Sequence, residues 1–510
     1  MKKHLFLIGM YLAVCQLAIA QYHDAKWVLC YGQTGYQNNV IVDFGTGQSP
    51  QALVTNTVVP MLIENASICD EQGNLLFFTN GTRVYDKNLN FIPGAFLPPP
   101  FDTAGVTLGL AQRQGCMFLP WPGDTNRYVL LHTTKELPLP SSYPGWIPYH
   151  LPTHLYMTTL DKTYNGGNGG IVSLSQVMLN DTLSNTGGGM AVTRHANGRD
   201  WWILVKKHYR NKFYKFLLTP TGLVSMGFQQ IGLDYQTRLG ELYIFTPNGE
   251  ILGGTVEPHT LALFKFDRCT GMLSNHQLLN NPATNSYSCE DLDFSSNSKV
   301  LYANERVKIF QYNLTGIDTP GVVQQTRTLI ADTAYTTLMC DTPGFYQKNF
   351  FPVGQLASNG IIYYPSNYAC PELTFIEYPD SLGMASGFNY AGFNIINTNA
   401  TAIPYFPNYR LGPITGSICD SLTSVHELQP QDISVYPNPA KDNLFITSSR
   451  SLNETVITLF NIHSQILLQQ SPGFGNNFEL TIPAEIGTGI YMLRIQSKEG
   501  VVTKKIVIGK

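Results

Sequence analysis

The densest group of polar and aromatic side chains in the sequence runs from Arg194 to Trp202. An arginine in this group could bind an anion through two parallel hydrogen bonds, and a tryptophan could stack on a sugar ring. The histidine and the aspartate could act as a general acid and a general base. The ligand-binding candidates of this segment are His195, Arg199, Trp201 and Trp202.

A structural interpretation of the same segment competes with ligand binding, and we favour it. Asn197-Gly198 is a typical two-residue hairpin turn. Arg199 and Asp200 would then form a salt bridge beside the turn, and the tryptophan pair would begin the next strand. Under this interpretation the segment positions a strand and contacts no ligand.

A second candidate binding region is the Pro-rich stretch at residues 136–153, taken together with Trp121. This stretch contains Trp146, and long loops on a rigid scaffold often carry binding residues. The alternative is a rim that packs against its own part of the fold. Trp121 and Trp146 are therefore candidate ligand contacts.

Recognisable catalytic and metal-binding motifs do not occur in the chain. Asp70, Glu71 and Asp86 are near one another only in sequence, whereas glycosidases need two carboxyl groups at a defined spacing across the ligand. His150 and His154 have a metal-binding spacing only on a helix, which the neighbouring prolines oppose. The sequence predicts no metal site and no cofactor, and it favours a protein that is not an enzyme without deciding the question.

The elements that must position these side chains are short strands joined by tight turns. A unit recurs along residues 21–420: a turn rich in Gly, Asn or Asp, a hydrophobic strand, a short connection and an aromatic strand. The six turns lie at residues 70–74, 122–124, 197–198, 248–249, 296–298 and 359–360. Their spacing fits one four-stranded blade per unit, which predicts an all-β fold with a β-propeller. We prefer seven blades to six, with the last blade formed by residues 27–31, 40–44 and 388–396.

The sequence pattern changes in the C-terminal residues 433–510, which contain about seven short predicted strands. This pattern predicts a small immunoglobulin-like β-sandwich. The segments VYPNPAKDNLFI, GIYMLRI and KKIVIGK resemble the type A sorting domain of type IX secretion cargo. That resemblance implies export across the outer membrane, followed by release or attachment at the cell surface. The residues that carry it are Tyr436, Pro437, Asn438, Pro439, Gly489, Tyr491 and Lys505.

The preceding body resembles propeller-like ectodomains that occur before this sorting domain and whose activities are largely uncharacterised. The likeness lies in ICDEQGNLLFFTNGTRVYDKN, HANGRDWWILV and NYRLGPITGSICD. It implies an architecture and says little about activity, because one fold serves many functions.

The N-terminal residues 1–20 are typical of a signal peptide, with Lys2 and Lys3 before an apolar run. A small-x-small pattern places cleavage between Ala20 and Gln21. We expect no transmembrane segment after the signal is removed. The formal net charge of −3 argues against nucleic acid as a partner.

Eight cysteines follow the predicted signal peptide, and an even number in an oxidising compartment favours disulfides. Local pairs are plausible for Cys269 with Cys289 and for Cys340 with Cys370. The sequence does not fix the connectivity, and free buried thiols are the alternative.

The predicted organisation is a signal peptide (1–20), a propeller-like ectodomain (21–420), a linker (421–432) and a sorting domain (433–510). We expect a secreted or surface-attached protein that passes through the periplasm and engages the type IX secretion machinery. The ectodomain is interpreted as a binding or adhesion module for a glycan or a surface protein. The alternative is a secreted hydrolase acting on carbohydrate, which two carboxyl groups facing each other in the central funnel would favour.

Overall fold

The structure is a computed structural model of the 510-residue chain. It describes residues 21–29, 38–45, 49–99, 109–138, 150–184, 189–208, 210–234, 242–257, 260–280, 289, 291–305, 307–332, 353–365, 371–396, 403–420, 433–461, 466–497 and 500–509. The predicted signal peptide and the predicted linker lie outside these ranges.

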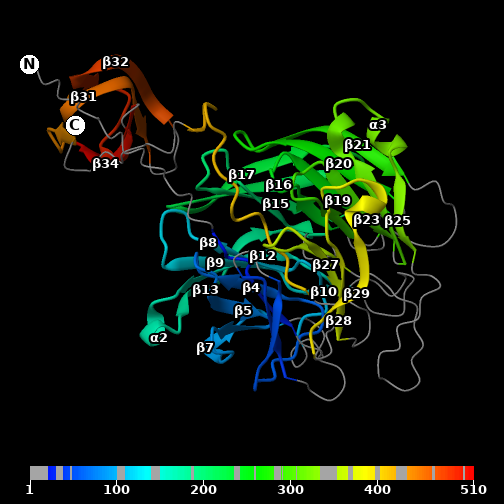
Figure 1. Cartoon of the computed structure of the whole chain (residues 1–510). Coiled ribbons are helices and arrows are strands. Elements are labelled where there is room, and N and C mark those ends of the chain that lie inside the picture. The colour runs from blue at the N-terminus through cyan, green and yellow to red at the C-terminus, as the bar shows by residue number, and fades with distance from the viewer. Residues whose placement is uncertain are drawn as a thin grey trace, which may run out of the picture. The chain divides into compact units, whose positions relative to one another are not determined.

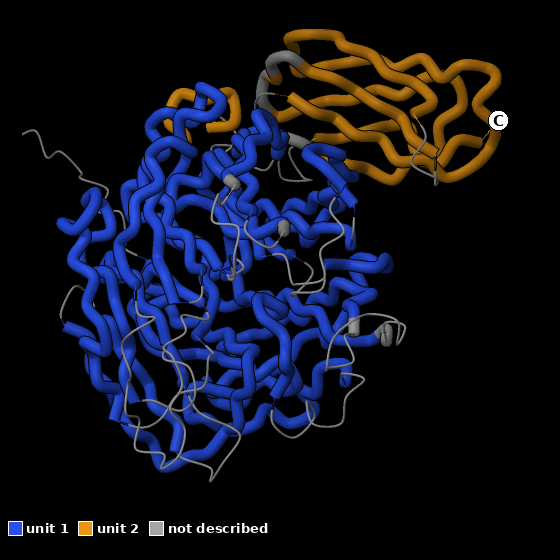
Figure 2. Tube along the Cα trace, turned by 90° about the vertical axis from the view of Figure 1, so that its right-hand side faces the viewer, with its two compact units in different colours: residues 1–413 blue, residues 414–510 orange. Residues whose placement is uncertain are grey.

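The chain divides into two compact units, residues 1–413 and residues 414–510, which Figure 2 shows in different colours. Strands dominate both units. The short helices of the described residues are α2 (Tyr164–Gly167), η2 (Leu314–Gly316), α3 (Val322–Gln325) and η3 (Gly383–Ser386). Within the described ranges, no helix combines the length and the apolar character needed to cross a membrane.

In its described residues, the first unit has seven antiparallel sheets of three or four strands that follow one another along the chain, which we number as blades 1 to 7. Blade 1 has three strands and the others have four. The strands are β1 (Lys26–Leu29), β2 (Val40–Asp43) and β3 (Gln51–Val54) in blade 1; β4 (Ala66–Cys69), β5 (Leu75–Thr79), β6 (Arg83–Asp86) and β7 (Phe91–Phe96) in blade 2; β8 (Cys116–Pro120), β9 (Arg127–His132), β12 (His154–Asp161) and β13 (Gly170–Asn180) in blade 3; β14 (Ala191–Arg194), β15 (Trp201–Lys206), β16 (Lys212–Thr219) and β17 (Gly222–Gln230) in blade 4; β18 (Tyr243–Phe245), β19 (Ile251–Glu257), β20 (Thr260–Asp267) and β21 (Met272–Asn280) in blade 5; β22 (Asp291–Phe294), β23 (Val300–Glu305), β24 (Lys308–Asn313) and β25 (Thr328–Asp332) in blade 6; and β26 (Gln355–Leu356), β27 (Ile362–Pro365), β28 (Glu372–Ile376) and β29 (Phe388–Asn394) in blade 7.

The first strand of each blade lies innermost. The first strands of neighbouring blades contact one another, as β1 and β4, β4 and β8, β14 and β18, β18 and β22, and β22 and β26 do. Innermost strands such as β4, β14 and β22 are buried at every residue, whereas the last strands β13 and β17 are largely exposed. A further pair, β10 (Leu137–Pro138) and β11 (His150–Leu151), lies within the blade 3 insertion. This radial arrangement is the predicted β-propeller.

The predicted turns join the first and second strands of blades 2 to 7. Residues 70–74 lie between β4 and β5, and residues 359–360 lie between β26 and β27. The composition proposed for the last blade was wrong. Residues 388–394 pair with β28 inside blade 7, and the N-terminal strands form blade 1 with β3 as their third member.

Ring closure brings blade 1 against blade 7. The ring centroid of Tyr363 in β27 lies 6.1 Å from that of Trp27 in β1 and 5.1 Å from that of Phe44, which follows β2. The dark blue N-terminal strands of Figure 1 accordingly lie beside β27 and β28. Among the described strands, none is shared by blades 1 and 7, and this aromatic packing joins the two blades.

The second unit is one sheet folded over its own core. Its strands are β30 (Ile433–Tyr436), β31 (Asn443–Phe460), β32 (Ile466–Thr481), β33 (Gly489–Ser497) and β34 (Gly500–Ile508). The first half of β31 pairs with β30 and the end of β32, and its second half pairs with β33 and the start of β32. Register shifts between residues 447 and 457 separate the two halves, so two long strands serve both layers of the sandwich.

The described cysteines divide into two classes. Cys269 and Cys419 are disulfide-bonded. Cys69, Cys116 and Cys289 are buried thiols that form no disulfide. The suggested pair of Cys269 with Cys289 was therefore wrong, since Cys289 lies buried as a thiol in the core of blades 5 and 6. Cys340 and Cys370 lie outside the described residues.

Candidate functional site

The segment from Arg194 to Trp202 forms the end of β14, a turn and the start of β15. Trp201 and Trp202 are buried at 0% and 2% exposure. Trp201 donates a hydrogen bond from Nε1 to the carbonyl of Pro120, and the guanidinium of Arg194 lies 3.9 Å from the Trp201 ring centroid. Neither indole therefore offers an open face to a sugar in this structure.

His195 and Arg199 are also engaged within the protein. His195 is buried, its Nε2 lies 3.1 Å from the carbonyl oxygen of Cys269, and its Nδ1 accepts a hydrogen bond from the N–H of Asn197. Burial lowers the pKa of this histidine. Arg199 Nε lies 2.7 Å from Asp200 Oδ1, the pair that the structural interpretation of the turn requires. An anion at Arg199 would have to compete with Asp200.

The other sequence-derived candidates are spread over the propeller. Trp121 is half-buried and donates a hydrogen bond from Nε1 to the carbonyl of Pro220 in blade 4. Trp146 lies outside the described residues. Gln21 Oε1 accepts a hydrogen bond of 2.6 Å from Arg194 Nη2, and Ala20 is not described. The structure does not bring the ligand-binding candidates together around one opening.

The acidic and histidine groups considered for chemistry have structural partners. Asp70 and Asp86 each accept hydrogen bonds from backbone N–H groups of their own turns. Glu136 accepts hydrogen bonds from Thr153 and Tyr156, and its Oε2 lies 3.0 Å from Nδ1 of His154. In the part of the chain that is described, no three His, Cys, Asp or Glu side chains form a group that could hold a metal ion.

Sequence reasoning missed residues 403–413, which we call the axial segment. It has no regular secondary structure, yet it contacts the inner parts of five blades. The hydroxyl of Tyr409 donates to the carbonyl of Phe118 in β8, and Asn408 Nδ2 donates to the carbonyl of Pro247 after β18. Phe406 N–H donates to Gln355 Oε1 in β26.

Two further contacts fix the axial segment. Arg194 Nη2 in blade 4 donates to the carbonyl of Tyr409. Arg410 forms an ion pair with Asp24, which precedes β1. Because these partners belong to blades on different sides of the ring, the segment crosses the propeller axis. In the sequence, only its second half was singled out, as the start of the stretch NYRLGPITGSICD, and that stretch has no period.

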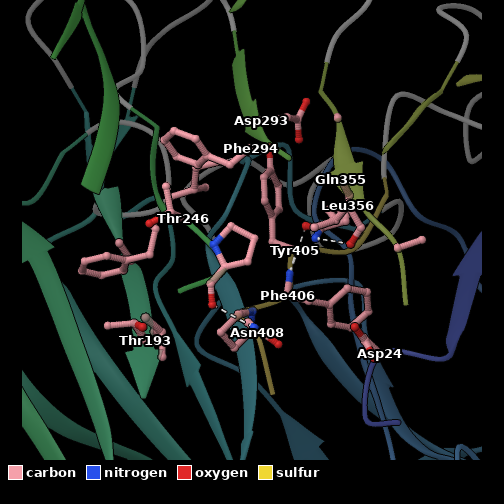
Figure 3. Close-up of a pocket in the computed structure, with 18 of the residues that line it drawn as sticks. Asp24, Thr193, Thr246, Asp293, Phe294, Gln355, Leu356, Tyr405, Phe406 and Asn408 are labelled. Carbon is pink, nitrogen blue, oxygen red and sulfur yellow. Dashed lines mark hydrogen bonds between the residues drawn. The ribbon is translucent and has the colours of Figure 1, made fainter. Parts of the chain in front are cut away.

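A cavity of about 260 Å³ lies beside the axial segment. It is lined by the inner strands β14, β18, β22 and β26 and by residues 405–408 and 410. Figure 3 shows Tyr405 in its middle, with Asp293 toward one end and Asn408 and Asp24 toward the other. Ligand pockets in propellers and barrels commonly occupy such a central position.

Most polar groups around this axial cavity are satisfied within the protein. Thr246 Oγ1 donates a hydrogen bond to Asn248 Oδ1. Nη1 and Nη2 of Arg410 each donate a hydrogen bond of 2.6 Å to the Asp24 carboxylate. Several buried polar atoms of lining residues have no well-formed hydrogen bond in the described structure. They include Asp293 Oδ2, which the Tyr364 hydroxyl faces, and Ser358 Oγ and Tyr405 Oη.

Asp293 is held in an unusual environment. Burial raises its pKa well above the ordinary value, and the nearby carboxyl of Asp291 raises it further. A Cβ at Gly354 would lie 1.9 Å from Asp293 Oδ2, so the glycine leaves the space that the carboxyl fills. Burial also raises the pKa of the Tyr405 hydroxyl, and the nearby carboxyl of Asp291 raises it further. The raised pKa favours the protonated form of each group, and in that form each can donate a hydrogen bond.

The two carboxyl groups do not have the arrangement of a glycosidase pair. Asp291 and Asp293 are two residues apart on β22, so they project from the same face of one strand. Asp291 accepts a hydrogen bond from the N–H of Gly354. The chemistry that this geometry supports best is hydrogen bonding to a bound molecule.

In the second unit, the Pro437–Pro439 segment closes the sheet. Asn438 Nδ2 donates to the carbonyl of Lys505 at 3.0 Å, and Asn438 Oδ1 accepts from the N–H of Val507 at 2.8 Å. Ala440 then forms a parallel bridge with Ile508. Tyr491 donates from its hydroxyl to the carbonyl of Gly487 and packs partly on the core.

Comparison with protein families gives the second unit its identity. Residues 434–509 match the family described as a secretion system C-terminal sorting domain. This region is a type IX secretion sorting domain. The chain is accordingly a type IX cargo protein, and its sorting domain implies involvement of that machinery and export to the outer surface or the medium.

A search of curated proteins found no match to the chain. Among solved structures, the chain is similar to PorZ of Porphyromonas gingivalis, with 9% identity, 96% of this chain and 69% of that chain covered, and a TM-score of 0.25. PorZ is described as a surface component of the type IX secretion system. The β-propeller domain of Cps50 from Myceliophteria thermophila gives 10% identity, coverage of 64% and 87%, and a TM-score of 0.34. A protein of unknown function from Desulfotomaculum acetoxidans gives 13% identity, coverage of 75% and 99%, and a TM-score of 0.39.

Proposed function

We propose that the exported propeller is a binding module whose ligand occupies the axial cavity. The observation that carries this proposal is the group of polar atoms without a well-formed hydrogen bond in residues that line the cavity. Buried polar groups normally have hydrogen-bond partners. Lining atoms without such partners are therefore expected in a cavity where a bound ligand or water supplies the missing hydrogen bonds. The ligand class is a glycan or a component of a surface protein.

The proposed route begins with a signal peptide that is cleaved between Ala20 and Gln21. The sorting domain then directs the protein across the outer membrane by type IX secretion. The protein ends either free in the medium or attached to the outer surface. Placing the propeller outside the cell fits a module that meets extracellular ligands.

Carbohydrate hydrolysis is the second candidate function, and one observation favours it. Asp293 lines the cavity, and burial raises its pKa, which favours the protonated carboxyl that a general acid needs. Against it, Asp291 belongs to the same strand, and a glycosidase needs its second carboxyl group on the opposite side of the scissile bond. Binding without turnover is therefore the better supported function.

One preparation of the purified protein tests both functions. Binding is measured on an array of glycans, and hydrolysis is measured on the same glycans. We expect binding without turnover. Turnover that is lost in Asp293→Asn would replace the binding proposal with the hydrolase. The absence of both binding and turnover would contradict both functions and direct attention to a protein partner.

A further inference from the structure

The three named atoms of the axial cavity come from three separate parts of the propeller. Asp293 belongs to β22 in blade 6, Ser358 to the turn after β26 in blade 7, and Tyr405 to the axial segment. Each can donate a hydrogen bond as a hydroxyl or a neutral carboxyl group, and each oxygen can also accept one. A ligand that satisfies all three must present several groups that both donate and accept.

The charges around the cavity argue against an ionic ligand. Among the described lining residues, the one cation is Arg410, and its guanidinium is committed to Asp24 through two hydrogen bonds. An anionic ligand would therefore find no uncommitted positive charge among these lining residues. Burying an unpaired charge is far more costly than burying a hydrogen-bonded hydroxyl group.

The size and the apolar lining of the cavity narrow the ligand further. A volume of about 260 Å³ is slightly below the roughly 300–1,000 Å³ that is usual for ligand pockets, so the cavity suits a small ligand such as one six-membered sugar ring. Phe294, Tyr405 and Phe406 supply aromatic surface between the polar groups. Aromatic rings pack against the C–H faces of sugars while hydroxyl groups form hydrogen bonds at the edges.

We infer that the axial cavity binds one neutral sugar ring, free or at the end of a glycan, through Asp293, Ser358 and Tyr405. The inference rests on the proposed function, because it names the ligand class of the same cavity. It excludes uronic and sialic acids and sugars with a free amino group as preferred ligands. Asp293 acts in it as a neutral hydrogen-bonding group.

The test measures the affinity of the purified full-length protein by titration calorimetry. The probes are galactose, mannose, fucose and N-acetylglucosamine as neutral sugars, glucuronic acid and N-acetylneuraminic acid as anions, and glucosamine as a cation. We expect at least one neutral sugar to bind at least tenfold more tightly than every charged probe.

Four variants test the site. Tyr405→Phe and Ser358→Ala each remove one hydroxyl group and should weaken binding about threefold to tenfold. Asp293→Asn keeps a neutral group that donates and accepts, so it should bind within about threefold of wild type, whereas Asp293→Leu should abolish binding. Tyr378→Phe is the matched control, because it removes an exposed tyrosine hydroxyl outside the cavity lining. Its affinity should equal that of wild type.

The outcomes separate the inference from the proposed function. Preference for a charged probe, with loss of binding in Tyr405→Phe, would overturn the neutral-sugar class and leave the binding function in place. Neutral-sugar binding that is unchanged in Tyr405→Phe and Asp293→Leu would place the site elsewhere and overturn the inference. If no probe binds, the inference is wrong, and the glycan array then decides the proposed function. Thermal melting of each variant identifies any that fail to fold, and Ser358→Ala, the smallest change, then carries the test.

Discussion

The guanidinium of Arg410 and the carboxylate of Asp24 form two hydrogen bonds of 2.6 Å across 386 residues of sequence. The pair ties the axial segment to the residues that precede blade 1. Asp24 is 3% exposed at its side chain and Arg410 is 33% exposed. The contact therefore joins the two ends of the propeller chain at its axis.

Removing Arg410 should destabilise the propeller. In Arg410→Ala the buried Asp24 carboxylate would lose its partner, which costs about 2–3 kcal/mol because Arg410 is partly exposed. Urea unfolding of the variant and of wild type measures the difference in free energy. The matched control is Arg210→Ala, whose pair with Asp234 is exposed and should be worth less than about 0.5 kcal/mol. Equal losses in both variants would show that the Arg410 pair has no special role.

Two glycines at equivalent turn positions should respond differently to alanine. Gly198 and Gly360 both have positive φ, at 70° and 82°. A Cβ at Gly198 would lie 2.6 Å from the backbone nitrogen of Pro413, whereas a Cβ at Gly360 would meet nothing within 4 Å. Gly360→Ala should cost about 1 kcal/mol from backbone strain alone, and Gly198→Ala should cost about 2–4 kcal/mol. Similar melting temperatures for the two variants would contradict the packing of the axial segment against this turn.

The blades could be predicted from sequence because their signals are local. The Asn-Gly turn at 359–360 and the apolar run after it are enough to indicate the hairpin of β26 and β27. The burial of Trp201 and Trp202 could not be predicted in the same way. An aromatic pair at a strand start looks the same whether the neighbouring blade covers it or not, and here blades 3 and 5 supply the partners.

The axial cavity could not be predicted because it depends on contacts between residues far apart in sequence. Tyr409 meets Phe118 at a separation of 291 residues, and no periodic pattern records such a contact. Asp293 was likewise invisible as a site residue, since its burial comes from Gly354 and the axial segment. In the sorting domain, the sequence predicts about seven short strands, whereas the described residues form five. The long strands β31 and β32 account for the difference, because a bend in a continuous strand resembles a break in sequence.

Glu64 should make the stability of the propeller depend on pH. Burial raises the pKa of this carboxyl from 4.5 to about 8, although hydrogen bonds from the N–H groups of Gly115 and Cys116 lower it. The folded state then binds more protons than the unfolded chain between pH 4.5 and 8. The contribution of Glu64 is therefore complete below pH 4.5 and is lost as the pH rises through 8.

The variant Glu64→Gln isolates this effect. Between pH 6 and 8.5 the unfolding free energy of wild type should fall relative to the variant by on the order of 3 kcal/mol. Buried histidines act in the opposite direction, because burial lowers the pKa of His23 and of His208 to about 4. Their contribution is present above pH 6.5 and lost as the pH falls through about 4, and it cancels in the comparison. Parallel pH profiles for the two proteins would disprove the assignment to Glu64.

Thiol labelling should separate the two classes of cysteine. Burial raises the pKa of Cys69 and Cys116 well above that of a free thiol, so neither should react with iodoacetamide in the folded protein. Denaturant without reductant should expose Cys69, Cys116 and Cys289 to labelling. Cys269 and Cys419 should label only after reduction. Peptide mass mapping reads each position, and labelling of Cys269 without reductant would contradict its disulfide.

Within the sorting domain, the Pro-Asn-Pro motif and the terminal lysines should have separable roles. Asn438 holds β34 through the backbone carbonyl of Lys505 and the N–H of Val507, not through the lysine side chain. The lysine side chain is exposed. The motif can therefore be tested as a structural contact, and Lys505 can be tested as a recognition point, by two single substitutions.

Asn438→Ala should destabilise the sorting domain by about 1–3 kcal/mol, because the loss of both side-chain hydrogen bonds leaves two backbone groups of β34 without those partners. Secretion should fall with it, measured as the ratio of exported protein to protein retained in the periplasm. Lys505→Ala should leave both stability and secretion near wild type, since the backbone carbonyl that Asn438 binds is unchanged. If Lys505→Ala instead blocks export while the domain melts at the wild-type temperature, then the secretion machinery recognises the lysine side chain. If Asn438→Ala is exported normally despite a lower melting temperature, then export does not depend on how firmly this sheet is closed.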